Sequence, residues 1–235
     1  MTTVAGLDTA TDDVSVAVVR DSEVVAEGIV PKPAAGYPRH SETLLAELET
    51  AVSESGGWGA VDFLAAGIGP GSFTGLRVGL ATARAIAQSL GKGIVPVGTL
   101  DALARGIAEG APEPDRPLLA VLDARRGQAF AALFGPDGTR RTEPFVASPE
   151  ELAERVATLP ETALAAGSGA LRFRRELEAA GAEVLADADS AHQVWARHLC
   201  RMAEGATPAR PGAIEPIYLR PPDAQIWRAR VPNGS

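Results

Sequence analysis

The sequence is poor in the residues that mark several common protein classes. It has one cysteine, Cys200, among 235 residues. No internal disulfide can therefore form, and we expect a reducing, cytoplasmic setting. There is no charge-free apolar stretch of about 18 residues, which argues against a membrane-spanning helix. Met1-Thr2-Thr3 leads straight into a strand pattern, without the basic and apolar regions of a signal peptide, so no secretion is expected.

Lysine is also scarce, and most of the positive charge is arginine. Lysine occurs only at Lys32 and Lys92, and the formal net charge is −8. This balance argues against a broad nucleic-acid-binding surface. A nucleic-acid-binding module stays open as an alternative, supported only by the arginines near the C-terminus, Arg220, Arg228 and Arg230.

The most distinctive segment is the glycine-rich run from Gly67 to Gly79. It follows an apolar strand pattern over 61–68 and leads into a helical pattern over 72–90. Gly69 and Gly71 allow a tight turn, and Ser72 can cap the helix. Free N–H groups at such a turn favour an anion site, although the segment could also serve only to turn the chain. The absence of a following lysine excludes a P-loop, and the spacing differs from that of a dinucleotide-binding fold.

The helix after this turn carries small residues at every fourth position, from Gly75 through Gly79 to Ala83 and Ala87. Glycine inside a helix costs about 1 kcal/mol relative to alanine, so close approach of another element is expected. That element could belong to the same chain or to another molecule.

The order of predicted elements repeats. Each half starts with a buried strand that ends in an acid, Asp8 or Asp123, and continues through a hairpin, a helix and a strand into a glycine turn. We predict an α/β protein of two tandem ribonuclease-H-like units, the actin-like ATPase (ASKHA) architecture, with units at 1–109 and 110–235. The last helix and tail of the second unit could pack back on the first. Two unrelated α/β halves are the alternative.

Five segments together resemble the bacterial TsaB (YeaZ) family, and they span nearly the whole chain in order. They are Val4–Thr11, His40–Glu42, Gly69–Gly79, Leu122–Gln128 and Pro216–Arg220. The resemblance implies a role in making threonylcarbamoyladenosine in tRNAs that read codons beginning with A. It implies a non-catalytic partner of the related transferase TsaD, with TsaE as a third component and TsaC supplying threonylcarbamoyl-adenylate. Contact with tRNA would come through the complex.

The resemblance also points to the helix pair 40–53 and 72–90 as the surface that meets TsaD, or a second copy of the chain when TsaD is absent. We predict that the two helices share an exposed face. The predicted interface residues are Leu44, Leu45, Leu48, Val52, Gly75, Leu76, Gly79, Leu80 and Ala83.

Several residues favour a chain without catalytic activity. TsaD holds its metal with a His-x-x-x-His pair, whereas here His40 is followed by Leu44. We therefore expect no metal, and a hydrogen-bonding role for His40 at its helix start. The turn after Asp8 has Ala10 where actin-like ATPases carry glycine against the phosphates. No cofactor is predicted, and weak nucleotide binding stays open in a vestigial cleft formed by Asp8, Thr9, Thr11, Gly69, Gly71, Ser72, Asp123, Gly167 and Gly169.

Asp8 and Asp123 are expected to cap nearby N–H groups or to fix Thr9 and Arg125 rather than to catalyse. The remaining alternative is an autonomous enzyme, either an actin-like ATP-dependent enzyme or a peptidase of the TsaD-related type. A peptidase needs a nucleophile with a base or a metal, and Ser72 has no evident His–Asp pair.

Overall fold

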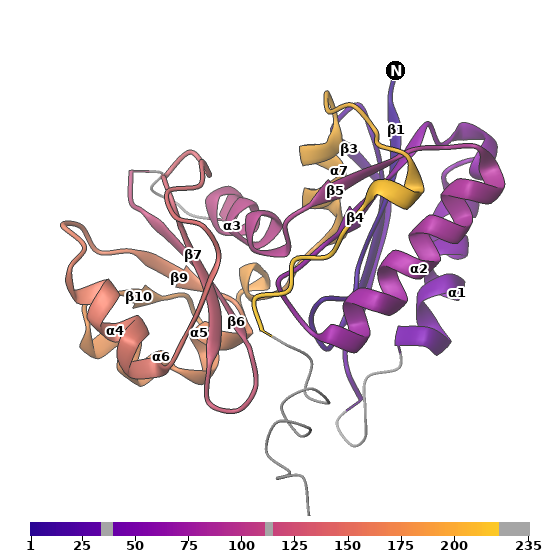
Figure 1. The fold of residues 1–235 in the computed structure, drawn as a ribbon. Coiled ribbons are helices and arrows are strands. Elements are labelled where there is room, and N and C mark those ends of the chain that lie inside the picture. The colour runs from indigo at the N-terminus through magenta and orange to yellow at the C-terminus, as the bar shows by residue number, and fades with distance from the viewer. Residues whose placement is uncertain (34–39, 111–114, 221–235) are drawn as a thin grey trace, which may run out of the picture.

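The computed structural model describes residues 1–33, 40–110 and 115–220. These residues form two lobes, each built on a five-stranded sheet (Figure 1). The strands of the first sheet are β1 Thr3–Asp8, β2 Val14–Arg20, β3 Glu23–Val30, β4 Phe63–Gly67 and β5 Ile94–Val97. The strands of the second are β6 Leu118–Asp123, β7 Ala129–Phe134, β8 Phe145–Ala147, β9 Leu164–Ala166 and β10 Glu183–Val184.

The two sheets have the same topology, which confirms the predicted duplication. In the first, β1 pairs antiparallel with β2, and β2 with β3, while β4 and β5 extend the sheet in parallel on the other side of β1. In the second, β6 takes the place of β1, with β7 and β8 antiparallel on one side and β9 and β10 parallel on the other. The short strands β8 and β10 were not expected from the sequence.

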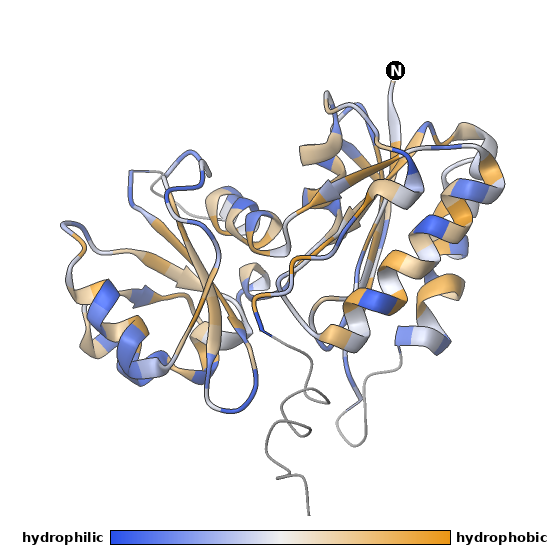
Figure 2. Ribbon diagram, in the orientation of Figure 1, coloured by the Kyte–Doolittle hydropathy of each residue, from blue (hydrophilic) through white to orange (hydrophobic). Residues whose placement is uncertain are grey.

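Helices cover both faces of each sheet. The helices are α1 His40–Glu54, α2 Phe73–Leu90, α3 Thr99–Gly110, α4 Pro149–Ala157, α5 Ser168–Arg172, α6 Arg174–Ala179 and α7 Ala196–Ala203. Helices α1 and α2 lie side by side on the outer face of the first sheet, where their apolar residues meet the strands (Figure 2). Three short 3-10 turns complete the described regular structure, at Trp58–Ala60, Ser190–His192 and Pro211–Ala213.

Two helices are exchanged between the lobes. Helix α3 follows the first sheet in sequence but packs mainly on β6 of the second, and α7 follows the second sheet but packs on β1 and β2 of the first. The predicted boundary between units 1–109 and 110–235 therefore does not coincide with the boundary between the packed lobes. Helix α3 falls in the first unit by sequence but packs on the second sheet. The two helices meet each other, and one apolar core containing Leu103, Ile107 and Leu199 joins both sheets.

The small-residue stripe of α2 faces inward, so the predicted shared exposed face is wrong for most of its residues. A Cβ added at Gly75 would overlap the Thr9 carbonyl oxygen, and one at Gly79 would overlap the Thr9 hydroxyl. The element that needs the close approach is thus the end of β1 with the turn that follows it, at Thr9 of the same chain. Only Leu45 among the predicted interface residues is exposed, and the buried ones are Leu44, Leu48, Val52, Gly75, Leu76, Gly79, Leu80 and Ala83.

Three helix boundaries shape the region around the cleft. The helical segment after Gly167 is divided into α5 and α6 at Phe173. Helix α7 begins at Ala196, after the 3-10 turn Ser190–His192. Thr99 is the first residue of α3, and its hydroxyl donates to Asp8.

The chain after α7 returns across the first lobe as an irregular strap, residues 207–220, coloured yellow in Figure 1. Ala209 pairs with Ile94, and the Ile217 amide donates to the Ile68 carbonyl at 2.7 Å. The Arg84 guanidinium donates to the Ile214 carbonyl. These bonds fix the strap along the first lobe, from β5 past the second half of α2 to the residue after β4.

The small-residue stripe of α2 predicts that a larger side chain at one of its positions lowers the stability of the fold. Gly79→Leu should lower the free energy of unfolding by about 1–3 kcal/mol, because the added side chain overpacks against Thr9 and Leu7. Ala81 is exposed on the opposite side of the same helix, so Ala81→Leu is the matched control and should change stability by less than about 0.5 kcal/mol. Urea unfolding of both variants measures the difference. Equal stabilities would show that the stripe does not pack against β1.

Candidate functional site

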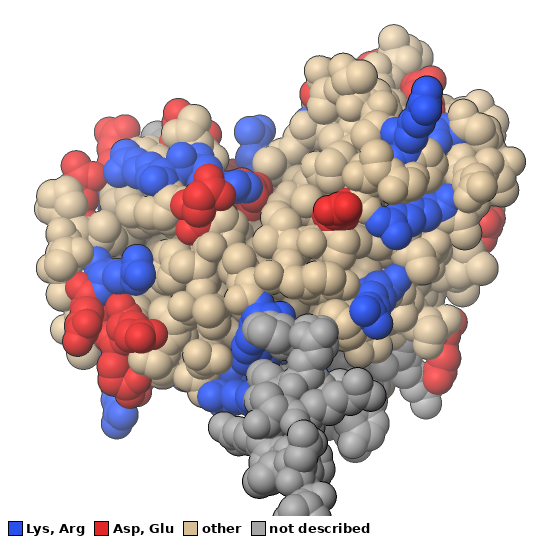
Figure 3. All heavy atoms as spheres, viewed as in Figure 1, with Lys and Arg blue, Asp and Glu red and all other residues tan. Residues whose placement is uncertain are grey.

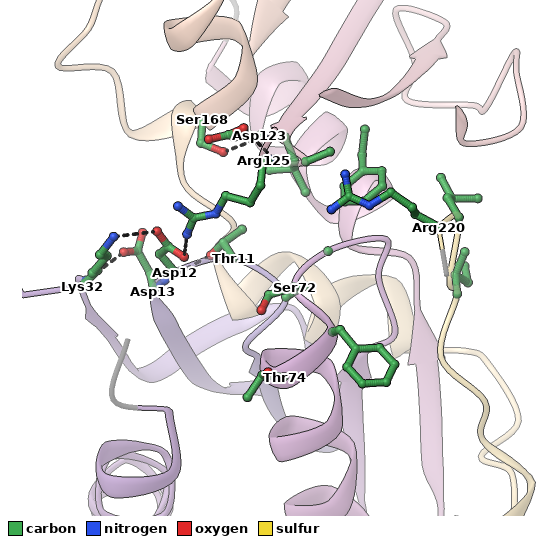
Figure 4. Close-up of a pocket in the computed structure, with 18 of the residues that line it drawn as sticks. Thr11, Asp12, Asp13, Lys32, Ser72, Thr74, Asp123, Arg125, Ser168 and Arg220 are labelled. Carbon is green, nitrogen blue, oxygen red and sulfur yellow. Dashed lines mark hydrogen bonds and ion pairs between the residues drawn. The ribbon is translucent and has the colours of Figure 1, made fainter. Parts of the chain in front are cut away.

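A cleft of about 560 Å³ opens between the two lobes. Its walls come from the β1–β2 turn, the start of α2, the β6–β7 turn and the strap (Figure 4). This is where the carboxyl ends of β1 and β6 face each other across the lobes, the region in which open α/β sheets place ligands. The cleft is therefore the candidate functional site.

Asp8 lies behind the wall of this cleft rather than in it. It is 2 % exposed; its carboxylate accepts from the Ala10 amide at 2.7 Å and from the Thr99 hydroxyl at 2.9 Å. The Thr99 hydroxyl in turn accepts from the Gly69 amide at 3.1 Å. Burial raises the pKa of Asp8 to about 6, against the opposing effect of these hydrogen bonds. Asp8 thus joins the end of β1, the glycine-rich turn and the start of α3.

The glycine-rich turn closes over the backbone that follows Asp8. A Cβ at Gly71 would overlap the Ala10 carbonyl oxygen, so the two segments touch backbone to backbone. The Ser72 amide donates to that carbonyl at 2.7 Å, and the Ser72 side chain caps the helix by accepting from the Gly75 amide at 3.3 Å. Two of the N–H groups considered for an anion site are therefore used inside the chain.

The second lobe presents Asp123 to the cleft. Its carboxylate accepts from the Arg125 amide at 2.8 Å and from the Arg172 guanidinium at 2.7 Å. The Ser168 hydroxyl accepts from the Asp123 amide at 3.1 Å. His192 Nδ1 accepts from the Gly167 amide at 3.1 Å and so holds the second glycine turn, a role that its sequence position did not indicate.

Charged side chains connect the lobes across the mouth of the cleft. Arg125, in the β6–β7 turn, forms an ion pair with Asp12 in the β1–β2 turn, and Lys32 contacts the same carboxylate at 3.4 Å (Figure 4). The neighbouring Asp13 accepts from the Lys32 amide at 3.1 Å, and burial raises its pKa. The cleft thus contains both signs of charge, and most of its charges are paired within the chain.

The strap brings together two sequence motifs that lie far apart in the chain. Phe73, from the glycine-rich motif, and Tyr218, from the strap, have ring centroids 5.1 Å apart. The guanidinium of Arg77 lies 3.8 Å from the centroid of Phe73. Arg220 points into the cleft and donates to the Gln128 side chain at 3.2 Å (Figure 4).

The predicted cleft residues are thus only partly at the cleft surface. Four of them line it, namely Thr11, Gly71, Ser72 and Asp123. The others support the walls from behind: Asp8, Thr9, Gly69, Gly167 and Gly169. Sequence reasoning did not select the lining residues Asp12, Asp13, Lys32, Phe73, Arg125, Tyr218 and Arg220 as a site. Phe73, Arg125, Tyr218 and Arg220 lie in the motifs that carry the family resemblance, which was the available signal.

Of the candidate metal and nucleophile residues, Ser72 lines the cleft, whereas His40 and Cys200 are buried away from it. His40 begins α1 and is buried, but its Nε2 has no hydrogen-bond partner, so the expected bond is not found at this atom. Leu44 packs in the core of the first lobe. Within the described ranges, no group of three or more His, Cys, Asp or Glu is placed to hold a metal. Cys200 is buried between α7 and β1, where desolvation raises the pKa of its thiol.

The comparison with known proteins starts from the family model described as "TsaD: tRNA N6-adenosine threonylcarbamoyltransferase", which matches residues 16–190. The tRNA threonylcarbamoyladenosine biosynthesis protein TsaB of Escherichia coli is 31% identical over 230 residues, covering 92% of this chain and 94% of that protein. A tRNA N6-adenosine threonylcarbamoyltransferase of Syntrophobacter fumaroxidans is 34% identical over 151 residues, 58% of this chain. The chain aligns with only 44% of that transferase.

Solved structures agree on the fold. YeaZ from Pseudomonas aeruginosa superposes with a TM-score of 0.74 over 93% of this chain and 100% of that one, at 23% identity. A ROK hexokinase from Thermus thermophilus gives 0.52 over 86% of this chain and 99% of that one, at 15% identity. The two duplicated lobes and their cleft therefore define a protein of the actin-like ATPase architecture. Within that class, the chain belongs to the TsaB (YeaZ) family.

The buried carboxyl of Asp8 predicts a pH dependence of stability. Its folded pKa of about 6 lies above the ordinary value of 3.8, so the folded state binds the proton more tightly. The wild type should therefore lose about 2 kcal/mol of unfolding free energy relative to Asp8→Asn as the pH rises from 4 to 7. The exposed Asp115→Asn serves as control. Parallel pH profiles for wild type and Asp8→Asn would show that Asp8 is not buried as a neutral acid.

Proposed function

We propose that this chain is the non-catalytic partner of the transferase TsaD in making threonylcarbamoyladenosine in tRNAs that read codons beginning with A. TsaE is the third component, and tRNA is contacted through the complex. The setting is the cytoplasm, where tRNA is modified. Support comes from the family membership and from the likeness to the E. coli protein over 92% of this chain.

The geometry of the cleft supports a chain without catalytic activity. The Ala10 amide donates to Asp8 and the Ser72 amide donates to the Ala10 carbonyl, so two N–H groups at the turn that actin-like ATPases use for phosphate are already occupied within the chain. The position four residues after His40 is filled by Leu44, whose side chain is 1 % exposed in the core and cannot serve as a ligand. The autonomous ATP-dependent enzyme and the peptidase are therefore the weaker alternatives.

We place the partner surface on the outer side of the same helix pair. The inner stripe is occupied by β1, but Ala81 and Ala85 form a second small-residue stripe that is exposed on α2. Leu45 on α1 is 51% exposed, and Leu90 at the end of α2 is 39% exposed. Small exposed residues beside apolar ones allow helices of another molecule to pack closely. The same surface could pair with itself in a two-fold homodimer when TsaD is absent.

The first functional prediction concerns chemistry. The purified chain alone should neither hydrolyse ATP nor transfer threonylcarbamoyl at a useful rate, because N–H groups at its phosphate turn are occupied within the chain and its second metal-ligand position is Leu44. Asp8→Asn should support tRNA modification when TsaD is present. The measurements are phosphate release by the isolated chain and the modified nucleoside in a reconstituted reaction. Steady turnover by contaminant-free protein would contradict the proposal.

The second functional prediction concerns the interface. Ala85→Trp should abolish both capture of TsaD and the homodimer, because the bulky ring keeps the partner helices apart, while the exposed position leaves folding intact. Ala157→Trp, at an exposed alanine of α4 on the other lobe, is the matched control and should bind normally. Pull-down with tagged TsaD and light-scattering mass report the result. Normal capture by Ala85→Trp would place the interface elsewhere.

A further inference from the structure

The aromatic pair on the rim of the cleft lies outside the residues of the proposed partner surface. Phe73 begins α2, Tyr218 lies on the strap, and their rings are 5.1 Å apart and tilted by 40°. Tyr218 is 41% exposed, although it is anchored by the adjacent bond from the Ile217 amide to Ile68. The strap thus holds a large aromatic side chain in place while leaving much of it open to solvent.

Two arginines flank this pair, and neither has a carboxylate partner among the described residues. Arg77 lies over the Phe73 ring at 3.8 Å, and Arg220 contacts only the neutral side chain of Gln128. The other basic groups around the cleft are neutralised: Lys32 and Arg125 by Asp12, and Arg172 by Asp123. In Figure 3, basic side chains gather at the lower part of the boundary between the lobes. The rim therefore combines an open aromatic face with two uncompensated positive charges.

A nucleotide matches this combination. Its base can stack on an aromatic ring or an arginine plane, and its phosphates attract arginine. The base must be unpaired, because a base inside a duplex has both faces occupied by its neighbours. Stacking of this kind tolerates a chain with net charge −8, since it needs only a local site and no broad basic surface.

The positions of the arginines favour a strand over a free mononucleotide. Arg220 lines the cleft, whereas Arg77 is exposed on α2 and is not part of the cleft wall. The two charges thus come from different elements, one on α2 over the Phe73 ring and the other on the strap, two residues after Tyr218. A strand carries phosphates on both sides of each base, while a mononucleotide carries them on one side only.

We propose that Phe73 and Tyr218 form a stacking platform for one unpaired base of an RNA strand, whose flanking phosphates pair with Arg77 and Arg220. The choice of RNA rests on the proposed function. The platform gives this chain a direct contact with the nucleic acid, in addition to any contact made through TsaD.

The test measures binding of a fluorescent RNA stem-loop to the full chain in the absence of TsaD, at low salt, by anisotropy. The same RNA annealed to its complement and free AMP are the comparison ligands. The stem-loop should bind more tightly than the duplex or AMP. Tyr218→Ala should weaken its binding about 5- to 150-fold, the equivalent of losing one stacked base, whereas Tyr218→Phe should bind like wild type.

Arginine variants test the charges separately. Arg220→Gln should weaken binding and reduce the slope of log affinity against log salt by about 0.7, the value for one phosphate contact on a single strand. Arg175→Gln removes a 91%-exposed arginine of the second lobe and should have no effect. The double variant Arg228→Gln/Arg230→Gln, in the C-terminal tail, should retain the preference for the loop.

Several results would overturn the proposal. They are no RNA binding by the wild type, equal binding of loop and duplex, AMP binding as tight as the stem-loop, wild-type affinity in Tyr218→Ala, or loss of binding only in the tail variant. Capture of TsaD by Tyr218→Ala should stay normal. Loss of capture would place these residues in the partner surface instead. Failure of RNA binding with normal capture leaves the partner role intact, so the two proposals can fail independently.

Discussion

The close packing of the start of α2 against the β1–β2 turn is the constraint on which the rest of the structure depends. Backbone touches backbone at Gly71 and Gly75, where a Cβ would overlap the carbonyls of Ala10 and Thr9. This contact seals Asp8 behind the wall, where Thr99 and the Ala10 amide bond its carboxylate. It also uses helix-start N–H groups inside the chain. Thr11 and Ser72, which flank this contact, line the cleft.

The two lobes are held together by more than a linker. The exchanged helices α3 and α7 pack against each other within a core shared by both sheets. The ion pair between Asp12 and Arg125 and the bond from Arg220 to Gln128 add connections across the cleft. Buried apolar contact carries most of the stability here, because partly exposed ion pairs contribute only about 0–1 kcal/mol each. Such a frame suits a protein whose proposed role is to present fixed surfaces to a partner.

Because an α-helix has 3.6 residues per turn, helix α2 presents different residues on its buried and exposed sides. One side carries Gly75 and Gly79 and meets β1, while the opposite side carries Ala81 and Ala85 and is exposed. Its first residue, Phe73, meets the strap through Tyr218. The glycine-rich motif therefore contributes to the core, to the proposed partner surface and to the aromatic rim at once. The effect of a substitution in this motif therefore depends on which of the three regions the substituted side chain contacts.

Local sequence patterns were sufficient to predict most of the elements and their order. Apolar period, turn residues and the repeated strand-to-acid pattern predict most strands, the long helices and the duplicated architecture, because these depend on local spacing. The short strands β8 and β10 lack such a pattern, since neighbouring strands rather than local preference hold them. The neighbour that fills the space beside Gly75 and Gly79 could be identified only from the folded chain, because a small-residue stripe indicates a close approach but not its partner. The tertiary structure likewise placed Tyr218 beside Phe73 and exchanged α3 with α7, which depend on contacts between residues far apart in the chain.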